Sequence, residues 1–392
     1  MRIVASRPDP ALVSLPWDKP LEEWQEYVVP VPRGLSRHVV RVIQLGRNFY
    51  AVKEMPEEIA FEEYRLLREL RRLGQPSVTP QAVVAGRPHE LPGALVTRHL
   101  PFALPYRTVF CGSLKPETLA RVVDALVVLL VRLHLVRFYW GDVSLSNVLF
   151  RRNAGEFAAY LVDAETGEFR PDLTDQMREW DLEVGCENVF AELLDLEASG
   201  EVRGGVEPEQ VVDILRQQYH SLWEALTGAE KFSTDEIWRI EQRIERLNQM
   251  GFDVDELDIV TEGQAVRIRP RVVEAGHHAR ELEELTGLRV EDNQARRLLN
   301  DLAAFTAYYG LGDVDRHVVA HRWLTEIFEP IAEMIPPDQR GKLEPAEFFH
   351  EVLVHRWYLS ERAGHEIKIF DVARDYVATQ LGEKPEERLP SS

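Results

Sequence analysis

The strongest constraint on the fold of this chain lies in two short segments, residues 141–150 (GDVSLSNVLF) and 159–165 (AYLVDAE). Both contain runs of apolar and aromatic residues that are typical of strands. Between them, residues 149–157 follow the order strand, turn, strand, which predicts a β-hairpin. This hairpin would bring Asn147 and Asp163, which flank it, to one edge of a single cleft.

The polar side chains of these segments have the spacing that phosphoryl transfer requires. Asp142 precedes Asn147 by five residues, and Asp163 closes the second apolar run. The reaction needs a carboxylate directed at the attacking hydroxyl, together with an amide and a carboxylate that hold magnesium on the nucleotide phosphates. We therefore expect Asp142 to be catalytic and Asn147 and Asp163 to be metal ligands, with ATP and Mg²⁺ as cofactors.

A second hairpin is predicted upstream. Residues 38–45 are rich in apolar and β-branched side chains, 46–48 predict a turn, and 49–54 predict the returning strand. Lys53 lies there in Ala-Val-Lys, the strand context in which a kinase lysine binds nucleotide phosphates. Most lysines on strands are simply solvated, so the order of the elements, rather than this residue alone, supports the assignment.

The next segment, residues 58–70, has apolar residues at helical spacing. A glutamate on this helix should pair with Lys53. Glu63 is the candidate because it precedes Leu66 and Leu67 by three and four residues, and Glu62 is the alternative.

Two further segments are candidates for nucleotide binding. Residues 33–37 (RGLSR) stand where a glycine-rich loop is expected, and there Arg33, Gly34 and Ser36 would contact phosphates. With one glycine, the loop offers a weaker cradle of backbone amides than a full one does, or another segment covers the phosphates. Residues 95–100 predict the strand that leads to the adenine, which places Thr97 and His99 beside the base.

Two helices are expected around the catalytic segment. The apolar residues 116–136 predict a helix that leads to Asp142, and a supporting helix is expected from about residue 178. Only seventeen residues separate Asp163 from Asp181, without an Ala-Pro-Glu motif. This leaves little room to lay out an extended peptide, so a sugar, a lipid headgroup or another small molecule is the more probable acceptor.

Residues 142–147 (DVSLSN) resemble the catalytic loop of the atypical kinases, namely the RIO kinases and the lipopolysaccharide (Kdo/WaaP-type) kinases. The chain as a whole resembles DUF4032, a bacterial family of uncharacterised proteins. The kinase likeness covers about residues 27–200 and implies a two-lobed, protein-kinase-like domain of the α+β class. The roles that it implies are phosphate binding for Lys53, positioning of Lys53 for Glu63, activation of the acceptor hydroxyl for Asp142, and Mg²⁺ binding for Asn147 and Asp163.

Besides its sparse glycine loop, the sequence departs from the kinase pattern at two further places. Trp140 stands where a histidine is usual, and Ala164 and Glu165 follow Asp163 where Phe-Gly is usual.

The second half of the chain has a helical pattern and no catalytic signature. Residues 196–205 (LEASGEVRGG) are small, polar and glycine-rich, so they predict a linker. We expect an N-terminal extension (1–26), a kinase-like domain (27–200, with lobes of about 27–100 and 101–200) and a helical C-terminal domain (206–392). Within the last, the pattern predicts helices at 208–226, 233–250, 276–286, 291–309, 314–334, 345–363 and 370–381, with a hairpin at 256–273.

Some residues of the second half have the spacing of binding sites, but each has a simpler explanation. His317 and His321 lie four apart on a helix, as metal ligands do, yet no carboxylate stands between them. Arg322 and Arg356 lie in two similar His-Arg-Trp triplets and would bind an anionic partner, although a packed tryptophan beside a surface arginine is the default. Residues 279–304 resemble a helix-turn-helix, but acidic residues crowd them.

Composition narrows the function classes. With 46 basic and 66 acidic residues the chain carries a formal charge of −20, which disfavours nucleic acid as a partner. The two cysteines provide neither a disulfide framework nor a metal site. No signal peptide or apolar run of about 20 residues is present, so we expect no membrane span and a cytoplasmic location.

The sequence thus favours an atypical, lipopolysaccharide-kinase-like enzyme that transfers the γ-phosphate of ATP to a hydroxyl acceptor. The alternative is a nucleotide-binding pseudokinase that acts as a regulator or scaffold, which the sparse glycine loop favours. A DNA-associated regulator is disfavoured by the charge. The C-terminal helices would shape the acceptor site, recruit a protein partner or mediate self-association.

Overall fold

The computed structural model describes residues 1–6, 9–30, 37–110, 116–200, 207–233, 238–249, 251–262 and 265–389. The chain forms two compact units. The first comprises Met1–Arg151 and Ala159–Tyr219, and the second comprises Arg152–Ala158 and the chain from His220 onward.

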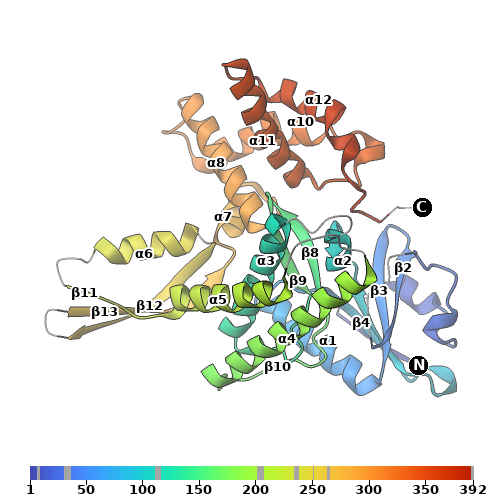
Figure 1. The fold of residues 1–392 in the computed structure, drawn as a ribbon. Coiled ribbons are helices and arrows are strands. Elements are labelled where there is room, and N and C mark those ends of the chain that lie inside the picture. Colours follow the sequence, from blue (N-terminus) through green and yellow to red (C-terminus); the bar gives the residue numbers. More distant parts are fainter. Residues whose placement is uncertain are drawn as a thin grey trace. The chain divides into compact units, whose positions relative to one another are not determined.

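The first unit begins with a five-stranded antiparallel sheet in the order β1-β4-β5-β3-β2 (Figure 1). Its strands are β1 (Arg2–Ala5), β2 (Val39–Leu45), β3 (Asn48–Met55), β4 (Thr79–Ala85) and β5 (Gly93–Arg98). Helix α1 (Glu57–Arg72) packs against β4 and β5. The hairpin and the helix predicted around Lys53 are therefore present as β2–β3 and α1.

The N-terminal segment covers one face of this sheet. Leu12, Trp17 and Trp24 are buried in one apolar cluster with sheet residues such as Ile43 and Val96. Successive strand residues point to opposite faces. The cluster takes Ala82, Val84, Ala94 and Val96, whereas the intervening Val83 and Leu95 are not in it. Residues 2–5 and 12–24, expected to form an extension ahead of the domain, thus contribute a strand and much of the apolar core to the sheet.

A buried arginine fixes this segment. The side chain of Arg87 is 1% exposed and pairs with Glu54 at 2.5 Å. Arg87 donates from Nε to the carbonyl of Trp17 at 3.0 Å and from Nη2 to that of Lys19 at 2.6 Å. Its guanidinium also lies 5.8 Å from the centre of the Trp17 ring. A buried charge is tolerated when it is paired and hydrogen-bonded, so these contacts tie the segment to the sheet.

The rest of the first unit is mainly helical. Its elements are β6 (Ala103–Pro105), α2 (Tyr106–Val109), α3 (Pro116–Leu135), β7 (Phe138–Tyr139), β8 (Val148–Asn153), β9 (Glu156–Leu161), β10 (Glu168–Phe169), α4 (Asp175–Ser199) and the start of α5 (Pro208–Thr227). The strands pair in the orders β6-β8-β9 and β10-β7. The hairpin predicted at 149–157 is β8–β9, and α3 and α4 are the two helices predicted around the catalytic segment. Helix α4 runs through residues 196–199 of the predicted linker, and residues 201–206 lie outside the described part.

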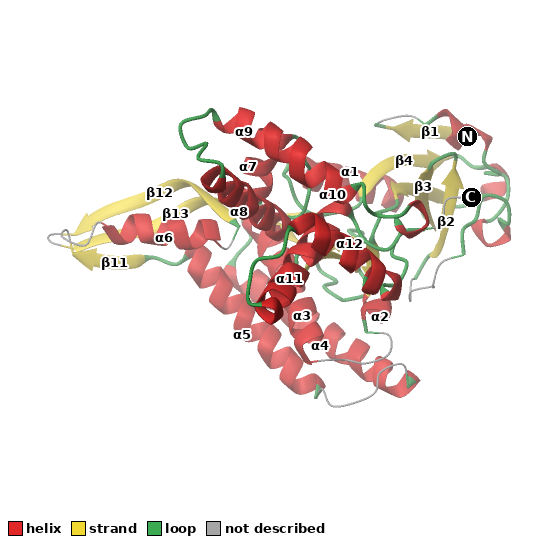
Figure 2. Ribbon diagram, turned by 90° about the horizontal axis from the view of Figure 1, so that it is seen from above, coloured by secondary structure: helices red, strands yellow, loops and turns green. Residues whose placement is uncertain are grey.

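The second unit contains a three-stranded sheet, in the order β11-β13-β12, and a helical bundle (Figure 2). Its elements are β11 (Glu230–Ser233), α6 (Trp238–Gln249), β12 (Phe252–Glu262), β13 (Ala265–Ala275), α7 (His277–Thr286), α8 (Asp292–Tyr308), α9 (Arg316–Trp323), α10 (Glu329–Ala332), α11 (Pro345–Ala363) and α12 (Ile369–Thr379). A π-helical turn, Leu324–Phe328, joins α9 to α10. The helices follow the predicted order, but strand β11 occupies residues expected between and within helices.

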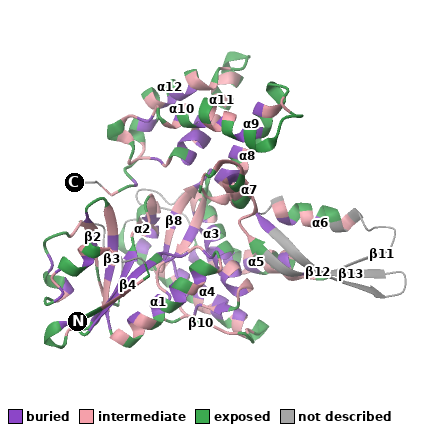
Figure 3. Cartoon of the chain, turned by 180° about the vertical axis from the view of Figure 1, so that it is seen from behind, coloured by how far each residue is buried: buried purple, intermediate pink, exposed green. Residues whose placement is uncertain are grey.

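The helices of the bundle carry both buried and exposed residues (Figure 3). The two His-Arg-Trp triplets differ in environment. Trp323 is fully buried and donates from its indole to Asp301 at 2.8 Å. Trp357 is 60% exposed, so the expected burial holds for only one of the two tryptophans. In the part of the chain that the structure describes, no helix is both long and apolar enough to cross a bilayer.

The tip of the β8–β9 hairpin is held inside the second unit. Glu347 of α11 accepts hydrogen bonds from the backbone N–H of Ala154 at 2.8 Å and from the side chain of Gln294 at 2.9 Å. Gln294 also donates from its backbone N–H to the side-chain oxygen of Asn153 at 3.2 Å. One hairpin therefore has its base in the first unit and its tip in the second.

We expect Trp17→Ala to destabilise the first unit by about 3–5 kcal/mol, because it leaves a large cavity in a packed cluster and removes the ring that lies against the Arg87 guanidinium. Val13→Ala, at a side chain that is 64% exposed in the same segment, should change stability by less than about 0.5 kcal/mol. Scanning calorimetry of both variants measures the difference. Equal effects would show that the segment is not part of the folded core.

Candidate active site

Lys53 lies at the centre of a cluster of acidic side chains. Strand β3 directs it toward α1, where its ammonium lies 3.1 Å from Glu63. The same ammonium lies 2.6 Å from Asp163 and 3.2 Å from Glu165. Glu62, the alternative partner, pairs instead with Arg65 on the surface. The geometry thus selects Glu63 of the two glutamates considered.

The cluster shifts the protonation of its members. Burial, and then the neighbouring Asp163, raise the pKa of Glu63 to about 7, against the opposing effect of Lys53 and of the Ala164 N–H, which donates to Glu63 at 3.2 Å. Burial lowers the pKa of Lys53, but the charges of Glu63 and Asp163 outweigh it, so the pKa is raised overall. Lys53 is therefore a firmly charged ammonium.

A buried aspartate positions the segment that carries Asp142. Asp181 of α4 is fully buried, and its two oxygens accept the backbone N–H groups of Trp140 and Gly141, both at 2.8 Å. Gly141 has a φ of +78°, and a Cβ there would lie 3.0 Å from the carbonyl oxygen of Thr166. Only glycine adopts this turn without strain, and Asp142 directly follows the turn in the chain.

Trp140 replaces a histidine without loss of support. Its ring is fully buried, and its indole N–H donates to the backbone carbonyl of Asp163 at 3.3 Å. Thr166 donates from its hydroxyl to the carbonyl of Trp140 at 2.9 Å. The side chain thereby connects the two segments that were first recognised in the sequence.

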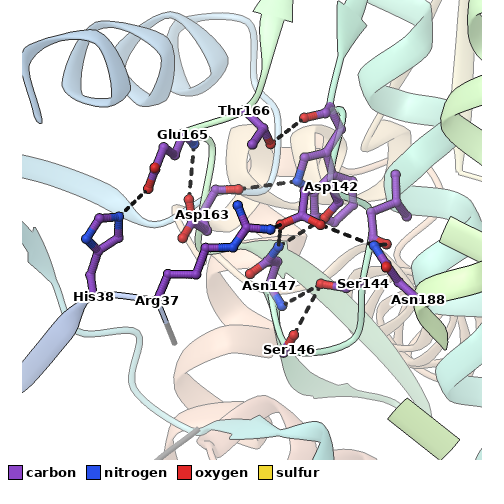
Figure 4. Close-up of polar contacts among 12 residues, drawn as sticks. Arg37, His38, Asp142, Ser144, Ser146, Asn147, Asp163, Glu165, Thr166 and Asn188 are labelled. Carbon is purple, nitrogen blue, oxygen red and sulfur yellow. Dashed lines mark hydrogen bonds and ion pairs between the residues drawn. The ribbon is translucent and has the colours of Figure 1, made fainter. Parts of the chain in front are cut away.

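The carboxylate of Asp142 is oriented by amides from two elements (Figure 4). Asn147 donates to one of its oxygens at 3.2 Å, and Asn188 of α4 donates to the other at 3.2 Å. Arg37 reaches the first oxygen at 3.5 Å. Sequence reasoning did not identify Asn188, which lies 46 residues after Asp142 on a helix whose facing could not be read from its pattern.

The hairpin brings Asn147 and Asp163 together as expected. The backbone N–H of Val162 donates to the carbonyl of Asn147 at 3.0 Å, which joins the two ends of the hairpin. Asn147 turns its amide nitrogen toward the backbone carbonyl of Asp142 at 3.0 Å, which leaves the amide oxygen for another partner. Glu192 of α4 accepts the N–H groups of Leu145 at 2.8 Å and Ser146 at 2.9 Å, which fixes the intervening loop.

Three carboxyl groups near Lys53 form a donor set of the kind that holds a divalent cation. Glu63, Asp163 and Glu165 each place an oxygen within 4.8 Å of the others, and they form the only cluster of this kind among the described residues. Two ligands of one cation are separated by at most twice the metal–oxygen distance, about 5 Å for Ca²⁺ and about 4.2 Å for Mg²⁺. Separations of up to 4.8 Å therefore fit Ca²⁺ directly and Mg²⁺ after a slight approach of the side chains. All-oxygen ligands select hard cations such as Mg²⁺.

Thr97 and His99 lie along the same sheet face as Lys53. In the register of β3 and β5, Lys53 is opposite Leu95 and Ala51 is opposite Thr97, so alternation places Thr97 on the face of Lys53. His99 follows, and burial lowers the pKa of its imidazole to about 4. The candidate phosphate-loop residues Arg33, Gly34 and Ser36 lie outside the described residues.

The other candidates are engaged elsewhere. His317 is exposed and lies 3.6 Å from Asp315, and neither it nor His321 belongs to a metal-ligand cluster within the described ranges. Arg322 pairs with Glu326 at 2.8 Å, and Arg356 donates to the carbonyl of Ile367 at 2.9 Å.

Comparison with known proteins gives two family matches. Residues 36–184 match the model of the Lipopolysaccharide kinase (Kdo/WaaP) family, and residues 221–381 match Domain of unknown function (DUF4032). A solved structure entitled "WaaP in complex with acyl carrier protein" is 18% identical, with a TM-score of 0.38, and the match covers 64% of this chain and 99% of that one. No curated protein matches. The resemblance and the predicted fold class are confirmed: a kinase-like α+β region precedes a mainly helical one, and the DUF4032 match covers the second half rather than the whole chain.

Burial of His99 predicts a pH dependence. The pKa of His99 is about 6.5 in an unfolded chain and is lowered by burial to about 4 in the folded chain. Stability should therefore fall as the pH drops from about 6.5 toward 4, and His99→Gln should reduce that fall. In an NMR titration, the His99 ring should keep its neutral chemical shift at pH 5.5. A ring that protonates above pH 6 would contradict the burial.

Proposed function

We propose that the first unit binds Mg-ATP and transfers its γ-phosphate to a hydroxyl group. The observation that carries the proposal is the convergence of five side chains from distant elements on one site. They are Lys53, Glu63, Asp142, Asn147 and Asp163.

Each of these residues has a definite task in the proposed reaction. Lys53, held by Glu63, binds nucleotide phosphates, and Asn147 and Asp163 offer oxygens to Mg²⁺. Asp142 is oriented by Asn147 and Asn188 and accepts the proton of the acceptor hydroxyl. The hydroxyl oxygen meanwhile attacks the γ-phosphorus. The bond from the γ-phosphorus to the bridging oxygen then breaks, and ADP leaves. Mg²⁺, when bound, neutralises the negative charge on the phosphates.

The short segment after Asp163 supports a small acceptor. Helix α4 begins at Asp175, so eleven residues, 164–174, connect the metal-binding aspartate to it. Within them β10 is tied to β7 through the pairs Glu168–Tyr139 and Phe169–Phe138. A segment so short and so firmly paired does not offer an extended platform for a peptide. We therefore favour a sugar, a lipid headgroup or another small hydroxyl compound.

One observation favours the alternative, a pseudokinase that binds nucleotide without turnover. The Lys53 ammonium contacts Asp163 and Glu165 as well as Glu63. Nucleotide phosphates must compete with these carboxylates for the same lysine. ATP binding without any release of ADP in the wild type would support this alternative.

The first test is nucleotide binding. At 100 times Kd, ATP adds about 2.7 kcal/mol to stability, which corresponds to a rise of several degrees in Tm. We expect this rise to need Mg²⁺ in the wild type and to be lost in Asp163→Ala. Asp172→Ala, which removes an exposed carboxylate nearby, should keep it. Equal shifts in the two variants would remove Asp163 from the metal site.

The second test separates binding from chemistry. Asp142→Asn keeps the shape of the side chain but cannot accept a proton, so the Mg²⁺-dependent rise in Tm should persist. Release of ADP from ATP, with water or an added hydroxyl compound as acceptor, should fall by about 10²–10⁴-fold. Turnover that matches the wild type would exclude Asp142 as the base.

A further inference from the structure

Glu165 is a charged side chain in the site that the proposed reaction does not yet use. Its carboxylate lies 3.2 Å from the Lys53 ammonium and 2.8 Å from Nε2 of His38. Its own backbone N–H donates to Asp163 at 3.0 Å. Figure 4 shows this short turn with the Glu165–His38 contact, and both acidic side chains also contact the Lys53 ammonium.

The carboxyl groups around Lys53 outnumber the one ammonium that they share. Three carboxylates, from Glu63, Asp163 and Glu165, face one ammonium, and the side chains of Lys53 and Glu165 are only 12% and 20% exposed. When the Lys53 ammonium binds phosphates and keeps its contact with Glu63, it compensates less of the negative charge of Asp163 and Glu165. Partly buried carboxylates next to the charges of ATP need a compensating cation.

We propose that Glu165 is a further metal-binding residue, which together with Asp163 holds a divalent cation against the nucleotide phosphates. Without nucleotide, the Lys53 ammonium contacts both carboxylates, so a divalent cation binds there only by displacing it. The distance criterion is met, since the oxygens of Asp163 and Glu165 lie within 4.8 Å of each other. The inference rests on the proposed function, because it assigns a role at the same nucleotide site.

The rival explanation is that Glu165 only positions Lys53 and His38. A positioning role and a metal-binding role differ in their dependence on the metal. If Glu165 only positions its neighbours, replacing it changes ATP affinity by the same factor with and without Mg²⁺. If Glu165 binds the metal, Glu165→Gln weakens binding of Mg-ATP, yet strengthens binding of metal-free ATP because a competing negative charge next to Lys53 is gone.

The experiment measures the ATP affinity of the full chain by calorimetric titration, in Mg²⁺ and in EDTA. The dissociation constant in EDTA, divided by that in Mg²⁺, should fall at least 10-fold in Glu165→Gln relative to the wild type. Glu168→Gln is the matched control, because Glu168 lies three residues on and forms a surface pair with Arg170. Its ratio should equal that of the wild type. An unchanged ratio in Glu165→Gln would overturn the proposal.

A second readout separates this inference from the proposed function. Electron paramagnetic resonance counts Mn²⁺ bound to the nucleotide-free chain, and Glu165→Gln should bind it at least 10-fold more weakly than wild type and Glu168→Gln. If Mn²⁺ binding depends on Glu165 while ATP binds to none of the proteins, the metal site stands and the proposed function fails. If ATP binds and Mn²⁺ binding ignores Glu165, the proposed function stands and this inference fails. Glu165→Asp retains the charge and controls for misfolding of the Gln variant. Its Mn²⁺ affinity should lie between those of the wild type and Glu165→Gln.

Discussion

The ion cluster around Lys53 is the contact on which the first unit depends. It joins strand β3 through Lys53, helix α1 through Glu63 and the segment after β9 through Asp163 and Glu165. A glutamate buried as deeply as Glu63 would be strongly disfavoured in the charged form without this lysine and the Ala164 N–H. The cluster therefore links the sheet, its helix and the hairpin through one lysine, and the same side chains form the candidate site.

Three polar side chains of helix α4 hold the other half of the site. Asp181, Asn188 and Glu192 bind, in turn, the backbone before Asp142, its carboxylate, and the backbone after it. The helix approaches closely because Gly185 lacks a side chain; a Cβ there would lie 2.8 Å from Val143. The long helix thus acts as a rigid support for a loop that has no regular structure of its own.

Sequence patterns predicted the elements and much of the site, because those features depend on neighbours close in the chain. The Ala-Val-Lys context in a predicted hairpin located Lys53, and helical spacing selected Glu63 over Glu62. The hairpin placed Asn147 beside Asp163. Asn188 and Glu192 were missed, since periodicity does not tell which face of α4 meets a loop more than 40 residues earlier. The contribution of residues 12–24 to the sheet was missed for the same reason: a face of a sheet gives no local sign of what covers it.

The β8–β9 hairpin links residues that lie far apart in the chain. Its two bases are the proposed ligands Asn147 and Asp163, and its tip depends on Glu347 and Gln294, more than 130 residues further along the chain. A boundary drawn at one point in the sequence would leave this tip without the groups that satisfy its backbone. A separate first half would therefore expose the Ala154 N–H to water, at the far end of the same two strands that carry Asn147 and Asp163 at their bases.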